Sequence, residues 1–248
     1  MAHKRACYCL SMFFMLAICI VPSLGETTGQ ILMRFKNSLS NDNALSNWGD
    51  ESNLCNWAGL LCANQIFYGL RLENMGLGGK VDVDTLSELS NLMIFSVMIN
   101  RFEGPLPEFK KLVGLRGLFL SNNNFSGEIP DDAFEGMENL KRVFMAENGL
   151  TGHIPKSLAN LPRLSDLDLH GNSFGGNIPE FQVKDFRVFN LSSNQLEGAI
   201  PASLSNEDPN SFAGNKGLCG KPLSNPCNKT PNKSEVPPKF DGQVGKRD

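Results

Sequence analysis

The sequence of 248 residues lacks the patterns that catalysis, cofactor binding or a metal centre would need. It has three histidines, and no nucleophile–base pattern or phosphate-cradling loop accompanies them, so no catalytic residue, cofactor or metal site is expected. Its formal net charge of −3 disfavours nucleic acid as a partner. The apolar run at 10–21 is 12 residues long, which is too short to span a bilayer.

The N-terminus has the pattern of a secretory signal peptide over residues 1–25. A basic start is followed by the apolar run at 10–21 and by Ser23-x-Gly25, a small-residue cleavage pattern. Cleavage after Gly25 removes two bases and no acids, so the net charge moves from −3 to −5. The mature protein is therefore expected to enter the secretory pathway.

A unit written L-x-x-L-x-L-x-x-N-x-L-x-G-x-I-P recurs along the chain. One copy, LRGLFLSNNNFSGEIP, covers 115–130, and the next, LKRVFMAENGLTGHIP, covers 140–155. The asparagine position is filled in six copies by Met75, Asn100, Asn123, Asn148, Asn172 and Asn194, so the first copy is degenerate. The intervals of 25, 23, 25, 24 and 22 residues are the leucine-rich-repeat period.

The chemistry of this unit predicts an α/β solenoid, a leucine-rich-repeat right-handed superhelix of about six repeats. The L-x-L core is a short strand with leucines inward and x positions outward, so parallel strands line a concave face. One coil cannot bury its apolar side alone, so neighbouring coils stack around a shared core. The asparagine is expected to bond the backbone of adjoining coils. Loops and short helical turns are expected on the outside.

The four cysteines that remain after signal removal are Cys55, Cys62, Cys219 and Cys227. Four cysteines allow three pairings, but here one close pair precedes the repeats and the other follows them. We therefore expect the disulfides Cys55–Cys62 and Cys219–Cys227, which suit a secreted protein.

These pairs predict disulfide-stapled caps that cover the two open ends of the stack. The N-terminal cap is expected to hold an amphipathic helix (Ile31, Leu32, Phe35, Leu39) with Trp48 and Trp57 as packing anchors. The expected organisation is a signal peptide at 1–25, an N-terminal cap at 26–65, six repeats at 66–206, a C-terminal cap at 207–227 and a flexible juxtamembrane-type stalk at 228–248.

The cap motif C-x-W-x-G-x-x-C at 55–62, together with GLRLENMGL, SGEIPDDAF and SFAGNKGLCGKPL, resembles the ectodomain of plant leucine-rich-repeat receptor-like kinases. The pollen receptor-like kinase group is the most similar. The resemblance implies a six-repeat ectodomain that is followed in the family by one transmembrane helix and a cytoplasmic kinase-like domain. Members perceive secreted peptides, often cysteine-rich, during pollen-tube growth and guidance. Since the sequence reaches Asp248 without such segments, we expect an ectodomain fragment or a secreted relative.

Outward positions of the predicted strands form the candidate binding face. Phe119 and Phe144 occupy equivalent positions in adjoining coils, and Met98 and Ile99 extend this apolar stripe toward the first repeat. An apolar stripe on a polar face indicates a binding site, although single exposed apolar residues are common and a cap or glycan could cover them. The predicted ligand-binding residues are Arg71, Met98, Phe119, Phe144, Asp168 and His170.

Two charged clusters have an ordinary explanation. Asp166, Asp168 and His170 on the fifth strand are expected to form a salt-linked surface with Lys141 and Arg142 rather than a metal or acid–base site. A second cluster holds five acids without a base between them: Glu128, Asp131, Asp132, Glu135 and Glu138. It is expected to be a solvated helical turn on the outer or lateral side, and the alternative is an attractor for a basic peptide.

Four N-x-S/T sequons predict N-glycosylation at Asn124, Asn190, Asn228 and Asn232. Asn190 lies at an outward position of the sixth strand. A glycan there would keep a partner from that end of the concave face. Ligand would then bind the middle coils, the lateral face or the C-terminal cap near 216–221.

Two functions are compatible with these features. The first is the ectodomain of a membrane receptor kinase on the extracellular face of the pollen-tube plasma membrane, reaching the membrane only through a segment absent from this chain. Its expected partners are a secreted peptide ligand, basic and cysteine-rich in character, and a co-receptor ectodomain. The second is a freely secreted binding protein or inhibitor, which applies if the chain ends at Asp248. The cap motifs favour the first.

Overall fold

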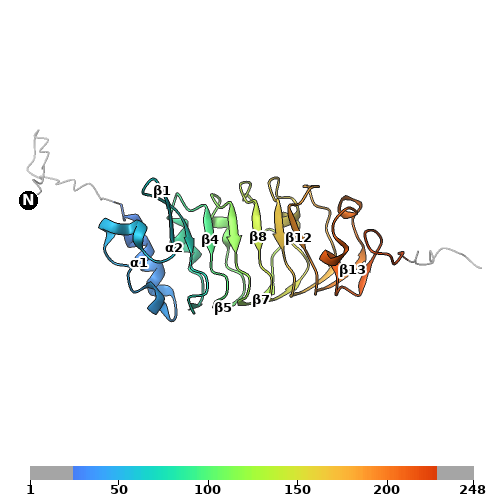
Figure 1. Ribbon diagram of the computed structural model, residues 1–248, viewed down its shortest axis with the longest axis horizontal. Helices are drawn as coiled ribbons and strands as arrows, with labels where there is room; N and C mark the ends of the chain where they lie inside the picture. The colour runs from blue at the N-terminus through green and yellow to red at the C-terminus, as the bar shows by residue number, and fades with distance from the viewer. Residues whose placement is uncertain (1–24, 228–248) are drawn as a thin grey trace, which may run out of the picture.

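The computed structural model describes residues 25–227 and shows an elongated stack of coils (Figure 1). The predicted signal peptide, except Gly25, and the predicted stalk at 228–248 lie outside the described residues. Within 25–227, the strands form two seven-stranded sheets that run along the stack. The predicted solenoid of short parallel strands is confirmed.

The first sheet contains the L-x-L segment of each repeat. Its strands lie in the order β1 (Leu60–Ala63), β2 (Ile66–Arg71), β4 (Ile94–Ser96), β6 (Gly117–Phe119), β8 (Arg142–Phe144), β10 (Asp166–Asp168) and β12 (Val188–Asn190). β1 pairs antiparallel with β2, and the other pairs are parallel. The central residue of each repeat strand points inward: Leu118 and Leu167 are fully buried. Such burial stabilises the fold by about 2–3 kcal/mol for each leucine.

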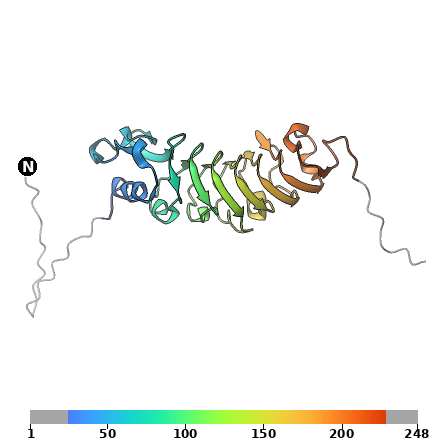
Figure 2. The ribbon, with the colours of Figure 1, turned by 90° about the horizontal axis from the view of Figure 1, so that it is seen from below.

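A second parallel sheet follows the asparagine position of each repeat, where loops were predicted. Its strands are β3 (Gly78–Gly79), β5 (Arg101–Gly104), β7 (Asn124–Glu128), β9 (Gly149–Gly152), β11 (Ser173–Asn177), β13 (Gln195–Ala199) and β14 (Gly217–Cys219). Figure 2 shows these strands side by side. Apart from the two-glycine strand β3, each carries one buried apolar residue; in β7 this is Phe125, which lies between exposed neighbours. The prediction of loops was wrong because two to five residues with one inward side chain are too short to show a strand period.

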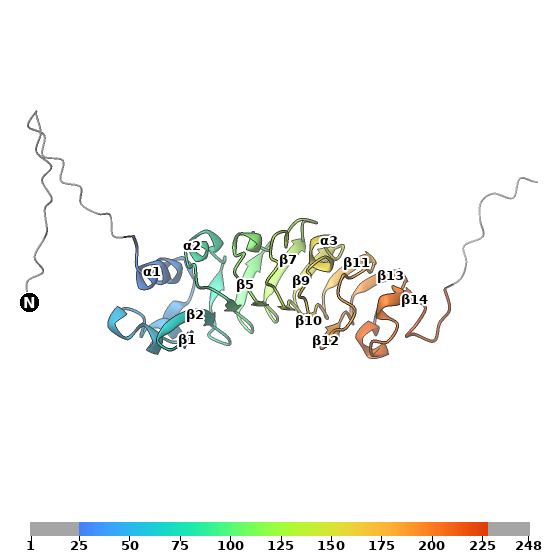
Figure 3. The same ribbon diagram turned by 90° about the horizontal axis from the view of Figure 1, so that it is seen from above.

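The outer side of the stack carries short helical turns, as predicted. These are α2 (Val83–Ser87), η3 (Phe109–Lys111), α3 (Lys156–Ala159) and η4 (Ala202–Leu204). Figure 3 shows an arch with α2 and α3 on its outer side and β2, β10 and β12 on its inner side. The first sheet therefore lines the concave face.

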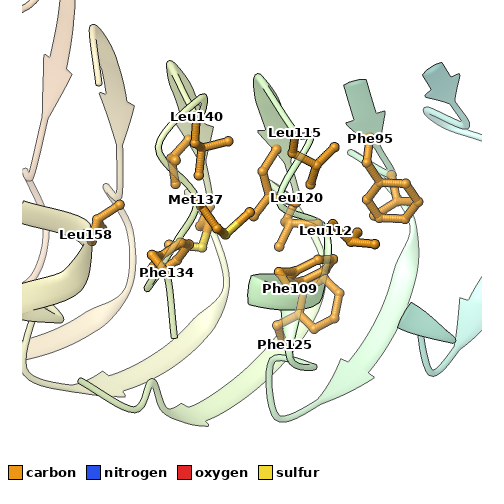
Figure 4. Close-up of a cluster of buried hydrophobic side chains, with 14 of the residues drawn as sticks. Phe95, Phe109, Leu112, Leu115, Leu120, Phe125, Phe134, Met137, Leu140 and Leu158 are labelled. Carbon is orange, nitrogen blue, oxygen red and sulfur yellow. The ribbon is translucent and has the colours of Figure 1, made fainter. Parts of the chain in front are cut away.

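One continuous core fills the space between the sheets and the helical turns. Figure 4 shows side chains from consecutive coils in contact, including Phe95, Leu115, Phe125 and Met137. Each of these four residues is at most 1% exposed. Each coil therefore depends on its neighbours for burial, as expected for a solenoid.

The repeat asparagines form a ladder of hydrogen bonds between coils, as predicted. The amide oxygen of Asn123 accepts from the Phe102 N–H at 3.0 Å, and its Nδ2 donates to the carbonyls of Val97 (2.8 Å) and Leu120 (3.0 Å). Asn100, Asn148, Asn172 and Asn194 repeat this arrangement. Among residues 25–227, no buried side-chain N or O atom lacks a partner.

The ladder continues one coil further than predicted. Asn215 Oδ1 accepts from the Leu196 N–H at 3.0 Å, and its Nδ2 donates to the Leu191 carbonyl at 2.9 Å. The interval from Asn194 is only 21 residues, and the following leucine stands three residues after the asparagine instead of two. This shift hides the seventh unit from a search for the repeat pattern.

The N-terminal cap covers both sheets at one end. Helix α1 (Thr28–Ser38) begins with a capping box at Thr27 and buries Ile31, Leu32 and Phe35. The chain continues through η1 (Asp42–Leu45) and η2 (Glu51–Asn56) to β1. Ser40 forms an isolated antiparallel β-bridge with Gly78 and so covers the edge of the second sheet. In the first sheet, β1 pairs with β2 and so covers the edge of the parallel strands. The predicted Cys55–Cys62 disulfide is present, and the rings of Trp48 and Trp57 stack 5.5 Å apart.

The C-terminal cap covers the opposite end. η5 (Pro209–Phe212) lies beside β12, where the Leu191 N–H donates to the Ser211 carbonyl at 2.8 Å. The predicted Cys219–Cys227 disulfide is present. Within its loop, Asn225 Nδ2 donates to the Leu218 carbonyl at 2.7 Å. This backbone carbonyl of the edge strand β14 thereby gains a hydrogen-bond partner. Both open ends of the stack are thereby covered, as a solenoid requires.

Candidate ligand-binding surface

The register of the first sheet places the last residues of its strands in one row across the concave face. We call this the central row; it contains Arg71, Ser96, Phe119, Phe144, Asp168 and Asn190. The apolar residues on either side of each of these residues are buried, so the row faces solvent or its neighbours. Three predicted site residues, Phe119, Phe144 and Asp168, lie on three consecutive strands.

The aromatic pair of Phe119 and Phe144 lies at the centre of this row. The two rings stack with centroids 5.3 Å apart and an interplanar angle of 24°, and both residues are half-buried. Gly117 lies beneath the first ring: a Cβ there would come within 2.6 Å of Phe119 Cε2. The absence of a side chain at Gly117 therefore lets the ring lie against the sheet.

Arg142 completes the aromatic pair and was not among the predicted site residues. Its guanidinium carbon lies 5.4 Å from the centroid of the Phe119 ring. This is a cation–π distance. The sequence feature that could have identified Arg142 is its position two residues before Phe144, which puts both side chains on the same face of β8.

The apolar surface continues toward the first repeat through Met98, which is half-buried, and Ile99, whose side chain is 52% exposed. Ile99 has φ 58°, in the left-handed region. The equivalent position is left-handed in the other coils too, but it holds Asn74, Asn122, Glu147, Gly171, Ser193 and Gly214. A β-branched residue is unusual there because its Cβ is crowded by the backbone. Ile99 therefore carries strain without the compensation of burial.

An acidic cluster lies beside the aromatic pair on the C-terminal side. Asp168 Oδ1 lies 2.7 Å from His170 Nδ1 and accepts from the His170 backbone N–H at 3.2 Å. His170 Nε2 lies 3.3 Å from Glu147 Oε1. One imidazole thus lies between two carboxylates, and the side chain of Glu147 is 55% exposed. The structure therefore brings the predicted Asp168 and His170 together and adds Glu147.

The ion pairs predicted for Asp166 were wrong. Arg187, not Lys141 or Arg142, forms a two-pronged pair with the Asp166 carboxylate, with Nε to Oδ1 at 2.8 Å and a shorter contact from Nη2 to Oδ2. Arg142 lies against Phe119 instead. Asp166 is 1% exposed, and its hydrogen bond raises the pKa of the Arg187 guanidinium. Arg187 precedes β12 on the neighbouring coil, and the repeat pattern carries no signal for such a cross-coil pair.

Arg71 lies apart from the other predicted residues. It is exposed on β2, and Ser96 separates it from Phe119 along the central row. Nearby, the Ser96 hydroxyl donates to Glu73 Oε1 at 2.6 Å. Arg71 and Met98 therefore belong to the N-terminal part of the face, one or two strands from the aromatic pair.

The acidic segment at 128–138 lies away from the concave face. Residues 131–136 form a turn rather than the helical turn that was expected. Lys110 Nζ lies 2.6 Å from Asp132 Oδ2, and this hydrogen bond lowers the pKa of Asp132. The turn borders a hollow of about 590 Å³, which is also lined by Lys156. Lysines thus partly neutralise the segment.

The four predicted glycosylation sites differ in their surroundings. Asn124 is exposed on β7 of the second sheet. Asn190 is half-buried on β12, and its Oδ1 accepts from the Ser192 N–H at 3.0 Å. Asn228 and Asn232 lie outside the described residues. Glycosylation remains a prediction at all four.

The described part of the chain shows neither a metal site nor a membrane-spanning helix. Between 25 and 227, no group of three or more His, Cys, Asp or Glu side chains is arranged to hold a metal ion. In the same range, no helix has the length and apolar character needed to cross a membrane.

Three family models match the sequence. The leucine-rich-repeat N-terminal domain matches 27–63, and leucine-rich-repeat models match 113–174 and 185–206. Pollen receptor-like kinase 2 of Arabidopsis thaliana is 47% identical over 230 residues, which are 92% of this chain and 34% of that protein. Pollen receptor-like kinase 4 of the same plant is 49% identical over 82% of this chain and 31% of its own length. The chain thus spans about a third of the length of these relatives.

Solved structures of receptor kinases are also similar to this chain. A crystal structure of a pollen receptor kinase 3 has a TM-score of 0.74 and 41% identity, covering 79% of this chain and 98% of that one. The Arabidopsis receptor kinase HAESA, crystallised with an N-terminally extended IDA peptide hormone, has a TM-score of 0.52 and 36% identity over 61% of this chain and 26% of that one. The chain therefore belongs to the pollen receptor-like kinase family and is a leucine-rich-repeat ectodomain of that family.

Proposed function

We propose that this chain binds a secreted peptide on its concave face, through the aromatic pair and the acidic cluster beside it. The contacts extend from Met98 through Phe119 and Phe144 to Asp168 and His170, and Arg71 contributes at the N-terminal end. The role is binding, and any catalytic activity would belong to a kinase domain such as the one the family resemblance implies. Support comes from HAESA, a 36% identical relative that was crystallised with a peptide hormone.

The stacked pair of Phe119 and Phe144 carries this proposal. Two half-exposed aromatic rings in contact form an apolar platform on a face that is otherwise largely polar. Aromatic residues are enriched at binding hot spots because they bury a large area with little loss of conformational entropy. The platform also lies at mid-face, where a partner would exclude most water.

The family of the protein supports a proposal for its wider role. We propose that it acts at the extracellular face of the plasma membrane, in the pollen tube, as the outer part of a receptor kinase. A bound peptide would then bring a second ectodomain into contact with it. A 28% identical structure, with a TM-score of 0.58, is a complex of two proteins, BIR3 and SERK2 of Arabidopsis thaliana.

The test compares peptide capture by the full secreted chain and by the F119A/F144A double variant. Secreted peptides from pollen tubes and pistil tissue are applied to each protein, and bound peptides are identified by mass spectrometry. Loss of two hot-spot aromatics should cost about 2–4 kcal/mol of binding free energy, which is a thirtyfold or greater loss of affinity.

Val113→Ala is the matched control, since Val113 is 57% exposed and lies between η3 and β6, outside the central row. It should capture the same peptides as the unaltered chain. If the double variant folds and also captures them unchanged, the concave face is not the binding site.

A further inference from the structure

We infer that the concave face selects an extended peptide segment in which an apolar side chain and a basic side chain are separated by one residue, an inference that rests on the proposed function. The apolar side chain packs on Phe119 and Phe144. The basic side chain reaches the carboxylates of Asp168 and Glu147. Charge and spacing on the concave face support this pattern.

The aromatic pair has opposite charges on two of its borders. Arg142 stands on β8 two residues before Phe144, and its guanidinium carbon lies 5.4 Å from the centroid of the Phe119 ring, so the positive charge lies off the central row. At the other border, Phe144 is the cross-strand partner of Asp168. A basic side chain next to the packed apolar group is repelled from Arg142 and attracted toward Asp168, since like charges in close contact are unfavourable. The basic side chain is therefore directed along the central row to Asp168, the next position after Phe144.

The negative charge beside the pair belongs to two carboxylates. Asp168 and Glu147 both contact His170, and one imidazole can offset at most one of their two charges, so a net negative charge remains. Two residues before Asp168 on the same strand, Asp166 is already paired with Arg187. A basic side chain would therefore find its partners at Asp168 and Glu147.

The distances fit a separation of one residue. Adjacent strands lie about 4.8 Å apart, so Asp168 lies about 7 Å along the row from the midpoint between Phe119 and Phe144. In an extended peptide, side chains two positions apart point the same way and are separated by about 6.8 Å. An immediate neighbour would point away from the surface. A residue four positions away would extend past the acidic cluster, at about 13.5 Å.

Small residues adjoin the row in the two coils that carry the aromatic pair. Ser121 and Ala146 stand two residues after Phe119 and Phe144 in their coils and are both small and buried. The Ala146 N–H donates to Ser121 Oγ at 3.0 Å, which shows that the two positions adjoin. Larger side chains, Met98 and His170, occupy the equivalent positions on either side.

The test uses a phage-displayed library of random linear heptapeptides, selected on the full secreted chain. The expected consensus is an aromatic or aliphatic residue, any residue, then Lys or Arg. The same library is selected on E147K, whose side chain is 55% exposed, and on D168N. Loss of one contact at a partly exposed charge should reduce the preference for the basic residue by about threefold or more, and E147K should favour Asp or Glu at that position. Thermal melts confirm that each variant is folded.

The outcomes separate this inference from the proposed function. A consensus that depends on Phe119 and Phe144 but has no basic residue two positions away would overturn the inference and leave the function intact. Peptides that bind F119A/F144A as well as the unaltered chain would overturn both. A selection that enriches no sequence would also contradict the inference, because the probe contains every apolar-x-basic triplet.

Discussion

Phe119 and Phe144 lie 25 residues apart in the chain, yet their rings stack with centroids 5.3 Å apart. The contact arises because one turn of the solenoid returns the chain to the same place on the next strand. The parallel register pairs their Cα atoms directly. An interaction that looks long-range in the sequence is therefore local in the stack, and a repeat period can place aromatic residues side by side.

Replacing Gly117 by alanine should disturb the aromatic pair without unfolding the protein. The new Cβ would lie 2.6 Å from Phe119 Cε2, so the ring must tilt away from the sheet. We expect the affinity for a selected peptide to fall about tenfold, which corresponds to about 1.4 kcal/mol. Titration calorimetry with a peptide from the selection measures this change.

Gly175→Ala is the matched control for Gly117→Ala. Gly175 also lies in a strand, but a Cβ there would be 3.8 Å from the nearest atom, the Gln195 carbonyl oxygen. This variant should bind like the unaltered chain. An equal loss of affinity in both variants would show that glycine content in the strands, rather than the position of the Phe119 ring, controls binding.

Replacing Ile99 by asparagine should stabilise the fold. Asn74 and Asn122 occupy the equivalent left-handed positions in the neighbouring coils, where asparagine tolerates this conformation better than a β-branched residue. Relief of about 1 kcal/mol of strain should raise Tm by about 2–4 °C in a domain of this size. Differential scanning calorimetry gives the change.

The control for Ile99 is Val113→Asn, which removes a similarly exposed β-branched side chain at a position without positive φ. It should leave Tm nearly unchanged. If both substitutions raise Tm equally, reduced surface hydrophobicity is the cause and strain at Ile99 is not.

The predictable and unpredictable parts of this structure differ in the range of the interactions that define them. The first sheet and the ladder from Asn100 to Asn194 follow from one repeat unit, because every copy places the same residue types at the same positions of its coil. The Phe119–Phe144 contact followed in the same way. In contrast, the pairing of Arg187 with Asp166 and the position of Arg142 against Phe119 depend on side-chain directions between coils. No period in the sequence encodes those choices.

The ladder should make a large contribution to stability at each coil. In Asn123→Ala, the Phe102 N–H and the carbonyls of Val97 and Leu120 lose their partner in a buried site. Unsatisfied buried groups cost about 1–3 kcal/mol each, so unfolding free energy should fall by roughly 3 kcal/mol or more. Urea unfolding followed by circular dichroism measures it.

Asn91→Ala serves as the control for Asn123→Ala, since Asn91 is exposed in a turn. Its unfolding free energy should change by less than about 0.5 kcal/mol. Equal effects at the two positions would mean that the hydrogen bonds between coils contribute little to stability.

The N-terminal disulfide should stabilise the cap over the first sheet. In the double variant C55S/C62S, the loop between residues seven apart is no longer closed. For so short a loop the chain-entropy estimate is about 2–3 kcal/mol. We expect a matching loss in thermal unfolding, and at least this loss when the unaltered chain is treated with a reductant, which also breaks Cys219–Cys227. A much larger loss from the reductant than from the variant would assign the difference to Cys219–Cys227.

The most direct test of peptide binding at the aromatic pair is hydrogen–deuterium exchange of the full secreted chain with and without a selected peptide. Binding as proposed should slow amide exchange in β6, β8 and β10 and in the residues that follow them, up to Glu147 and His170. The outer turn at 131–138 should exchange at the same rate in both samples. Protection confined to that turn or to the C-terminal cap at 216–221, with none in β6, β8 and β10, would contradict binding at the aromatic pair.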